Sequence, residues 1–476
     1  MMETVDAGTL VDYYAHPAVR ARIREYCGLD GAGERACVYL SAHFPASPTP
    51  SGWVREPQFP TAALEDLLKQ RADLFRSLWD RHSMLVCLDL DYLNVDRPGH
   101  ALACPFDTFH KIEPTYVALR GLLQEHGMNM LALMTGRGYQ LTGRVPLNAP
   151  LVQRLATLAP GVPDWYDTQA RRLASWITDR MSPTCARAYV ALGLVLEHLA
   201  HTLMARAAPQ SPVPVVLNGT NVGLGPCGRE AVSLDLSFAG DPLDVRHIRV
   251  AFGGYQGHRF RPDIFGSEVS GLAPLITVPR GHASLADMLR ERRAPNGAAR
   301  LAESSDARIP DVTDGLDGLV VEYERSPLAR FHRAFYATEP DDPAAWSYTY
   351  DRLDVSALPP CVAAPLAHPN DRLLKPEYLQ HVTRYLMSEG WPPRHIAGLV
   401  WSRYAKDFAW GERWACLSPR TRADFDVRVF AGLIATGADR GVDFNCRSAQ
   451  EKHLCPVSDC PRDLRVDRDR LLRTVA

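Results

Sequence analysis

The sequence predicts an α+β protein in which a sheet-based domain is followed by a mostly α-helical one. Segments 84–94 and 232–238 carry the apolar runs and period-two alternation that are typical of strands. Segment 371–390 instead repeats apolar residues at helical spacing and ends at a glycine. We therefore expect four parts: an N-terminal helical region (1–80), a sheet-based domain (81–280), a linker (281–354) and a helical C-terminal domain (355–476).

The remaining elements follow from local pattern. Residues 1–80 show helical spacing over 18–26 and 61–79, with a Pro/Ser-rich loop over 46–60 between them. The low hydrophobicity of 281–345 is the reason for expecting a linker there, with one helix in it. Within the sheet-based domain we expect further elements: a helix over 113–126, two strands joined by a turn over 128–146, helices over 151–207 and a short strand over 247–252.

Composition bounds the class of protein. The chain has 476 residues, of which 46% are hydrophobic and 23% charged, as in ordinary soluble globular proteins. No apolar run reaches the roughly 18 residues of a membrane span, so we expect no membrane partner. The N-terminal sequence lacks the basic and apolar parts of a secretory signal, so we expect a cytoplasmic protein. The net charge of −2 neither supports nor excludes nucleic acid as a partner.

The strand predicted over 84–94 ends in two carboxylates, Asp89 and Asp91. Residues two apart in a strand point to the same face, about 6–7 Å from one another. Such a pair repels unless cations lie between the carboxylates, and pairs of divalent metals drive nucleotidyl transfer. The alternative interpretation is a strand that runs into an Asp-rich turn, since NVDRPG follows.

A second element is TGRGYQ, residues 135–140, between two predicted strands. Glycines allow backbone N–H groups to approach a phosphate closely, and Arg137 would add a fixed cation. A plain β-hairpin turn explains the same residues equally well when the segment is read alone.

A third element is Asp235, on the polar side of the alternating strand VSLDLSF, followed by Arg246, His247 and Arg249. A third carboxylate would complete a two-metal site, and the arginines could hold a triphosphate. A solvated strand face is the alternative interpretation of the same pattern.

The order of these three elements resembles the archaeo-eukaryotic primase superfamily, the catalytic small subunit of primase and its primase-polymerase relatives, over about residues 80–265. The resemblance implies an RRM-like catalytic core with helical additions. It implies that Asp89, Asp91 and Asp235 are catalytic and bind Mg²⁺ or Mn²⁺. It also implies a nucleotide site made of Thr135, Arg137, Gln140, His247 and Arg249. Gln140 stands where the family usually has His, and a glutamine can donate a hydrogen bond to a phosphate but carries no charge.

The C-terminal region contains FNCRSAQEKHLCPVSDC, in which Cys446, Cys455 and Cys460 have the spacing C-x8-C-x4-C. With Cys361 these cysteines make four thiolates, the number that an iron–sulfur cluster or a structural zinc requires. Two competing ligands remain open, Cys416 and His453, and so does a set of buried cysteines without any metal.

Pro-Pro-Cys, a helical pair, a cysteine and then Leu-Cys-Pro-x-x-x-Cys resemble the iron–sulfur domain of the primase large subunit, over about residues 355–465. This second resemblance implies that Cys361, Cys446, Cys455 and Cys460 hold a [4Fe–4S] cluster, with Zn²⁺ as the alternative. It also implies that the helical domain holds the template and the initiating nucleotide. The candidate contacts are Arg384, Arg394 and Arg403, for which a solvated helix face is the other interpretation.

Together the two resemblances imply a single-chain DNA primase or primase-polymerase, a nucleotidyltransferase that makes primers by a two-metal mechanism. The implied partners are a single-stranded DNA template, NTP or dNTP, and a primer or RNA/DNA duplex, with a helicase or other replication proteins left open. The alternative hypothesis is a non-catalytic or weakly active nucleic-acid-binding protein on a primase scaffold, because fold alone does not determine function.

Overall fold

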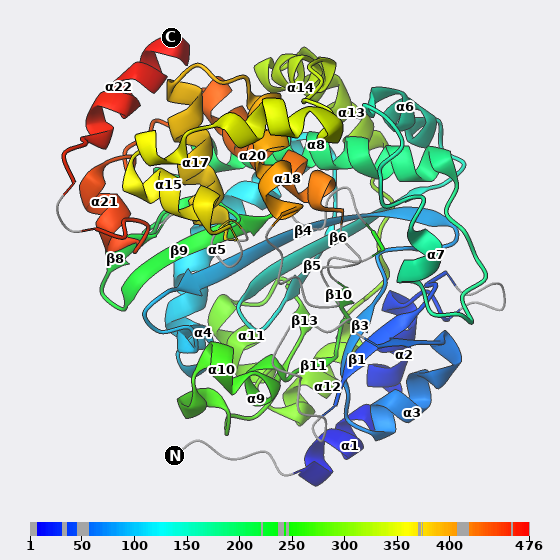
Figure 1. Ribbon diagram of the computed structural model, residues 1–476. Helices are drawn as coiled ribbons and strands as arrows, with labels where there is room; N and C mark the ends of the chain where they lie inside the picture. The colour runs from blue at the N-terminus through cyan, green and yellow to red at the C-terminus, as the bar shows by residue number, and fades with distance from the viewer. Residues whose placement is uncertain are drawn as a thin grey trace. The chain divides into compact units, whose positions relative to one another are not determined.

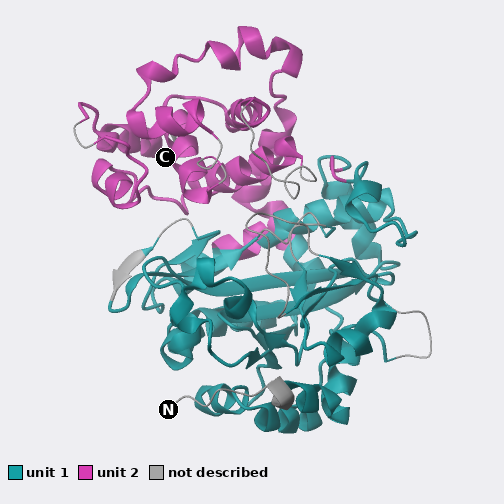
Figure 2. Cartoon of the chain, turned by 60° about the horizontal axis from the view of Figure 1, so that its bottom comes forward, with its two compact units in different colours: residues 1–162, 166–196, 202–320 teal, residues 163–165, 197–201, 321–476 magenta. Residues whose placement is uncertain are grey.

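The chain has a mixed α+β fold, as the sequence predicts (Figure 1). It divides into two compact units (Figure 2): unit 1 contains residues 1–162, 166–196 and 202–320, and unit 2 contains residues 163–165, 197–201 and 321–476. The computed structural model describes residues 7–30, 36–44, 57–219, 222–236, 242–243, 247–369, 373, 375–406, 418–457 and 460–475.

Unit 1 is organised around a seven-stranded sheet in which the long strand β4 (Ser83–Asn94) lies between β6 (Gly138–Pro146) and β9 (Gly228–Asp235). Both neighbours are antiparallel to β4, which is buried along most of its length. The outer strands are β5 (Leu131–Met134), β7 (Val215–Leu217), β8 (Gly223–Gly225) and β13 (Val278–Pro279). The strands predicted over 84–94, 128–146 and 232–235 are therefore confirmed; Ser237 and Phe238, the predicted end of the last strand, lie outside the described residues.

The helix α5 (Pro105–Glu125) packs on the sheet and determines which face is the core. Tyr139 of β6 is fully buried, stacks on Tyr116 at 4.1 Å and meets Phe109 edge-on at 5.3 Å. Leu90 is opposite Tyr139 and so faces α5 as well. The residues that alternate with these two, Asp89 and Gln140, therefore project from the other face of the sheet.

A second sheet contains strands in the order β10-β3-β1-β2. Its members are β1 (Leu40–His43), β2 (Gln58–Phe59), β3 (Asp73–Arg76) and β10 (Ile248–Arg249), and β11 (Gly254–Tyr255) pairs separately with β12 (Leu275–Ile276). The N-terminal region also contains α1 (Ala7–Ala15), α2 (Pro17–Tyr26) and α3 (Leu64–Lys69).

The expected helix over 61–79 is wrong in its second half. The helix stops at Lys69, and residues 73–76 form β3, which pairs with β1 on one side and β10 on the other. Leu74 and Leu78 fit helical spacing, but pairing on both edges buries all four residues of this strand, and partners distant in sequence leave no local signal.

The stretch expected as a linker, 281–354, is largely helical: it contains α11 (Leu285–Glu291), α12 (Pro295–Ser304), α13 (Thr313–Arg325), α14 (Pro327–Ala337) and two 3₁₀ turns (Pro343–Tyr348 and Tyr350–Arg352). The helix α12 packs on α1 and α2 through small residues, including Ala298, Ala299 and Ala302. Alanine is only weakly apolar, yet a row of alanines can form the buried face of a helix. The low hydrophobicity of this stretch was therefore not evidence for a linker. The boundary between the units falls within α13, after residue 320.

Unit 2 is helical in its described part, apart from turns and loops. The helices predicted over 371–390 and after Pro392 correspond to α17 (Pro376–Ser388) and α18 (Pro393–Tyr404), which pack on α20 (Pro419–Ala435). Further helices of this unit are α14, α15 (Pro360–Ala367), α21 (Cys446–Glu451) and α22 (Leu464–Val475). Several helices of this unit begin with Pro, whose fixed φ suits the first turn of a helix.

A buried charged network lies at the centre of unit 2. Glu197 is fully buried and accepts hydrogen bonds from Arg428 Nε at 3.1 Å, while its other oxygen lies 3.2 Å from His332 Nε2. Despite burial, Arg428 and His332 lower the pKa of Glu197 to about 2. The carboxylate therefore remains ionised in the core, which requires its partners to stay in place.

The helix α8 (Pro183–Ala207) is, among the described residues, the one long and apolar enough to cross a membrane. Of its most apolar window, 72% is buried inside the protein, as in the core helix of a globular fold.

Candidate functional sites

The antiparallel register of β4 and β9 brings three aspartates together. Asp89 lies directly opposite Asp235, and Asp91, opposite Ser233, is two residues further along β4. Because strand side chains alternate, Asp89, Asp91 and Asp235 project from the same face. Cβ atoms of directly opposed residues lie about 4.5–5.5 Å apart, so the carboxylates form one acidic patch.

Arg137 supplies a cation to this patch. Its Nη2 lies 2.6 Å from Asp91 Oδ2. The charge of Asp91, with smaller contributions from Asp89 and Asp235, raises the pKa of Arg137 well above its ordinary value. Burial, followed by the charges of Asp89 and Asp235, likewise raises the pKa of the thiol of Cys87, which lies two residues before Asp89 on β4. Both shifts therefore reflect the negative charge that Asp89 and Asp235 bring to this face.

The glycines of the TGRG hairpin are required by packing. A Cβ on Gly138 would lie 1.8 Å from the Leu90 carbonyl oxygen, and one on Gly136 would lie 2.6 Å from the Tyr255 ring. Both positions therefore exclude any side chain. The hairpin that the sequence predicts is present, and its close approach to β4 explains its glycines without a phosphate.

The hairpin backbone is held at both ends. Thr135 N donates to the Gly138 carbonyl at 2.8 Å, and Gly138 N donates to Thr135 Oγ1 at 3.2 Å. Tyr92 N donates to the Arg137 carbonyl at 3.0 Å. Thr135 is thus a residue that shapes the turn, and Arg137 is the one of the two whose side chain reaches the aspartates.

Gln140 joins the two sheets. It is 3% exposed, its Nε2 donates to Tyr26 Oη at 3.0 Å and to the Arg249 carbonyl at 3.2 Å, and its Oε1 accepts from Arg249 N at 3.1 Å. The amide expected to contact a nucleotide is thus engaged inside the protein. An amide can donate and accept at once, which suits this bridging position.

Arg249 and His247 also have partners within unit 1. Arg249 Nη1 lies 2.7 Å from Asp73 Oδ1, and its guanidinium lies 4.0 Å from the centre of the Tyr255 ring. His247 Nε2 lies 3.1 Å from Tyr39 Oη. Arg246, named with them in the sequence, lies outside the described residues. The sequence did not reveal Asp73, because the expected helix over 61–79 hid a strand.

Arg292 was missed as well, because it lies in the stretch expected as a linker. It is 1% exposed and donates from Nη2 to the Thr135 carbonyl at 2.6 Å and from Nε to the Ile276 carbonyl at 3.0 Å. Its guanidinium lies 5.4 Å from the centre of the Phe109 ring, and burial lowers its pKa. Arg292 thus stabilises the hairpin through its hydrogen bond to the Thr135 carbonyl.

The four predicted cluster cysteines gather in unit 2. Cys361, on the first turn of α15, is 4% exposed. Burial, and then the neighbouring thiols of Cys455, Cys446 and Cys460, raise its pKa to about 12. All three C-terminal cysteines therefore lie within electrostatic reach of Cys361, although 85 residues or more separate them in the sequence.

One of these sulfurs also has a backbone N–H donor. Cys446 Sγ accepts a hydrogen bond from Leu464 N at 3.4 Å, the kind of contact that tunes iron–sulfur sites. The four sulfurs are not among the ligand groups that lie within 4.8 Å of one another in the described chain.

Cys416 and His453 are the two residues that compete as ligands of this centre. Cys416 lies outside the described residues. His453 adopts φ 57°, and its carbonyl accepts a hydrogen bond from Tyr378 Oη at 3.0 Å. This left-handed turn positions the chain just before Cys455, which gives His453 a backbone role next to the cysteines.

The interpretation of the C-terminal arginines as a solvated helix face is wrong for two of them. Arg384 is 5% exposed and donates to Asp439 at 2.7 and 2.8 Å, and Arg394 is 6% exposed and pairs with Asp424 at 2.6 Å. Arg403 donates to the Tyr350 carbonyl at 3.1 Å. These side chains stabilise contacts between elements of unit 2.

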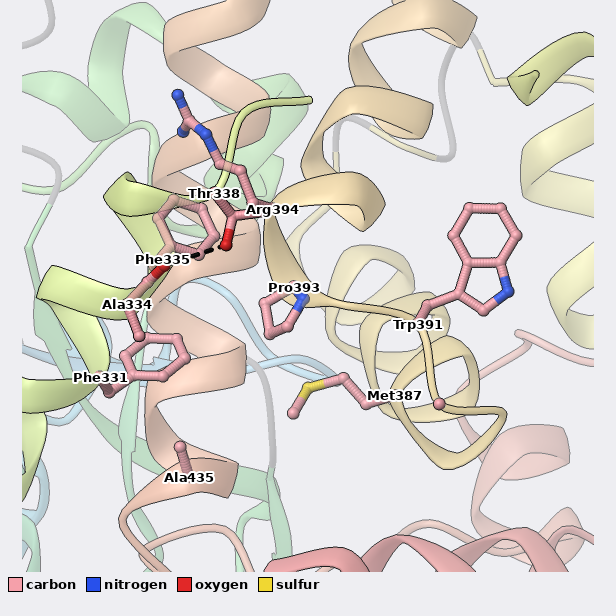
Figure 3. Close-up of a pocket in the computed structure, with 10 residues that line it drawn as sticks. Phe331, Ala334, Phe335, Thr338, Met387, Trp391, Pro393, Arg394 and Ala435 are labelled. Atoms are coloured by element: carbon pink, nitrogen blue, oxygen red, sulfur yellow. Dashed lines mark hydrogen bonds between the residues drawn. The ribbon is translucent and has the colours of Figure 1, made fainter. Parts of the chain in front are cut away.

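A cavity of about 470 Å³ lies in unit 2 (Figure 3). Phe331 and Phe335 of α14 lie on one side of it, with Met387 and Trp391 on the other. Arg394 also lines it, with its guanidinium 5.0 Å from the centre of the Phe335 ring. The lining is mainly apolar, and the Arg394 guanidinium is already paired.

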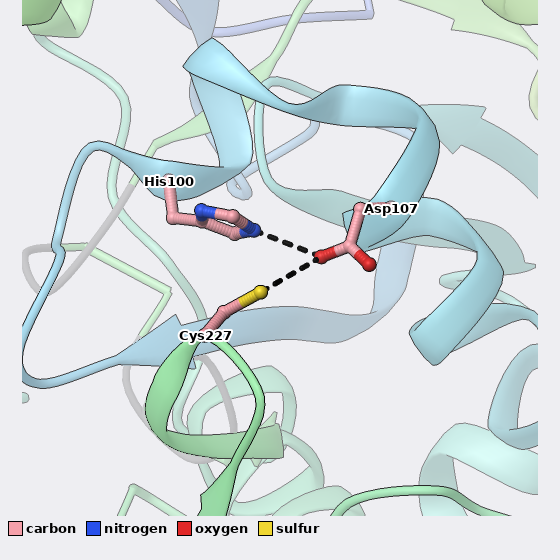
Figure 4. Close-up of side chains that lie close together, drawn as sticks. All are labelled: His100, Asp107 and Cys227. Atoms are coloured by element: carbon pink, nitrogen blue, oxygen red, sulfur yellow. Dashed lines mark hydrogen bonds and ion pairs between the residues drawn. The ribbon is translucent and has the colours of Figure 1, made fainter.

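The sequence also failed to reveal a group formed by His100, Asp107 and Cys227 (Figure 4). Asp107 Oδ2 lies 2.8 Å from His100 Nε2 and 3.7 Å from Cys227 Sγ, so these atoms could hold a metal ion. However, Lys111 Nζ lies 2.8 Å from the same oxygen and 2.9 Å from Glu230 Oε1. The Lys111 ammonium already supplies the positive charge that a metal ion would bring to these carboxylates. The cluster therefore links α5 to the turn before β9 through ion pairs and hydrogen bonds.

A comparison of the chain with protein-family models, with curated proteins and with solved structures finds no match.

Proposed function

We propose that the protein is a single-chain primase-polymerase, which joins nucleotides on a single-stranded DNA template. The observation that carries this proposal is the register that sets Asp235 opposite Asp89, with Asp91 on the same face. Three converging carboxylates are a suitable ligand set for Mg²⁺ or Mn²⁺, which prefer oxygen ligands. We further propose that the sheet carrying them is an RRM-like core.

In this function the three carboxylates would hold the divalent ions. Ions bound there would activate a 3′-hydroxyl for attack on the α-phosphate and stabilise the leaving pyrophosphate. Arg137, which projects to the same face, would bind the triphosphate oxygens. Gln140 and Arg249 would act mainly by joining the sheets beneath the site, since their side chains already have partners.

For unit 2 we propose a [4Fe–4S] cluster held by Cys361, Cys446, Cys455 and Cys460. A cluster there would cross-link distant segments of the chain and supply a redox-active centre. Zinc remains the alternative. The helical unit would contact the template and the initiating nucleotide through groups other than the buried guanidiniums of Arg384 and Arg394.

The experiment is primer synthesis on single-stranded DNA with Mn²⁺ and either ribo- or deoxynucleotides. We expect product from the wild type and from Asp96→Asn, whose exposed carboxylate pairs with Arg229, but not from Asp89→Asn. Absence of product from the wild type with both kinds of nucleotide would count against the proposal.

A second function, nucleic-acid binding without catalysis, is favoured by one observation. Gln140 and Arg249, both expected to bind nucleotide, are engaged inside the protein. Metal dependence separates the two functions. If Asp89→Asn leaves single-strand binding and every measured activity unchanged, the binding function is the correct one.

A further inference from the structure

We infer that Arg137 competes with the divalent metal for Asp91, so that nucleotide and metal bind cooperatively. The inference rests on the proposed function, because it concerns the same aspartates. It goes beyond that function by giving Arg137 a role before any nucleotide has bound.

The first support is the ion pair itself. Arg137 Nη2 lies 2.6 Å from Asp91 Oδ2, with 27% of the Arg137 side chain and 12% of the Asp91 side chain exposed. A charge pair so shielded from water interacts more strongly than one on an open surface. The guanidinium therefore occupies one side of a carboxylate that a metal would need.

The second support is the rigid backbone on both sides of the pair. Tyr92 N holds the Arg137 carbonyl at 3.0 Å, and Gly138 packs against the Leu90 carbonyl without room for a Cβ. Arg137 can therefore leave Asp91 only by rotating its side chain, not by moving the hairpin. The charges of Asp89 and Asp235 also favour the guanidinium at its present position.

The consequence is a linkage between two ligands. A divalent ion on Asp91 would face the guanidinium across one carboxylate, and these two positive charges repel. A triphosphate offers Arg137 a second anionic partner, and so lowers the cost of releasing Asp91 to the metal. Coupling of this kind is reciprocal: nucleotide tightens metal binding, and metal tightens nucleotide binding by the same factor.

The test measures Mn²⁺ binding to the purified full chain, without nucleotide, by the loss of the free-ion signal in electron paramagnetic resonance. We expect Arg137→Gln to bind Mn²⁺ about tenfold more tightly than wild type, and Arg137→Lys to lie between them. Arg206→Gln is the matched control, because it removes an exposed arginine paired with Glu125 elsewhere in unit 1. It should leave the affinity unchanged.

Two further measurements make the result decisive. Adding Asp89→Asn and Asp235→Asn to Arg137→Gln should abolish the tightened binding, which locates it at the aspartates. If Arg137→Gln binds Mn²⁺ at these aspartates no more tightly than wild type, the competition is excluded while the proposed metal site stands. If no variant shows Mn²⁺ binding that depends on Asp89, both the inference and the proposed function fall.

Discussion

The aspartates of unit 1 and the cysteines of unit 2 are brought together in different ways. Asp89, Asp91 and Asp235 lie on two paired strands, so the hydrogen-bonded ladder of the sheet fixes their relative positions. Cys361 and Cys446 lie in the first turns of separate helices, and Cys455 and Cys460 lie in the loop after α21. The first site therefore needs no metal to form, whereas the second joins segments that a bound centre would hold together.

The largest effect should come from the paired strands. Replacing Asp89 by Asn keeps the shape of the side chain but removes a charge, so we expect primer synthesis to fall by a factor on the order of 100 or more. Thermal unfolding should change little, because the ladder is unaltered. An unfolding temperature that falls together with activity would show that Asp89 serves the fold, and would remove the contrast between the two sites.

For the cysteines we expect a loss of stability, in contrast to the aspartates. Cys460→Ser removes one of four thiolates, so the protein should lose its bound metal and unit 2 should lose about 3 kcal/mol or more of stability. Iron and zinc analysis after anaerobic purification, with a melting curve, measures both. Cys104→Ser changes an exposed cysteine of unit 1 and should alter neither. Unchanged metal content in Cys460→Ser would contradict the assignment of the cluster ligands.

A third prediction concerns acid, to which unit 2 should be sensitive independently of its cysteines. Burial lowers the pKa of His201 to about 4, from 6.5. The unfolded chain therefore binds the proton first as pH falls, so stability is lost between pH 6.5 and 4, by at most about 3 kcal/mol. Urea unfolding at pH 7 and pH 4.5 measures this loss.

His201→Gln removes the titrating group and should reduce the loss, whereas His110→Gln, at an exposed position of unit 1, should not. An equal pH dependence in wild type and His201→Gln would show that other groups determine the acid response of unit 2.

The smallest effect is expected for the support of the hairpin. Arg292→Met leaves the buried Thr135 and Ile276 carbonyls without donors, at a cost of about 1–3 kcal/mol. Arg292→Lys should recover part of this, because it restores one donor. Chemical denaturation of both variants tests the prediction, and a Met variant as stable as wild type would show that the hairpin does not depend on Arg292.

The sequence predicted elements whose signal is local. The alternation in β4 and β9 and the apolar spacing in α17 each lie within one segment, so they could be recognised directly. The strand β3 could not, because Leu74 and Leu78 fit a helix as well as a strand and the pairing partners lie elsewhere in the sequence. The helix α12 was also not recognised as part of the packed fold, because its buried face consists of alanines rather than large apolar residues.

The candidate site could be predicted in its residues but not in all their contacts. Alternation alone placed Asp89 and Asp91 on one face, while the register that adds Asp235 is a tertiary property. Sequence could not reveal that Gln140 bonds to Tyr26, or that Asp73 neutralises Arg249, since both contacts join distant segments. Residues predicted to touch a nucleotide thus proved to have partners inside the fold.

The most direct test of the central claim is primer synthesis by the wild type and by Asp235→Asn, on the same single-stranded template with Mn²⁺. If the paired strands form the metal site, the wild type makes product only when the metal is present, and Asp235→Asn makes almost none. Equal product from the two proteins, or product from the wild type in excess chelator, would contradict the account.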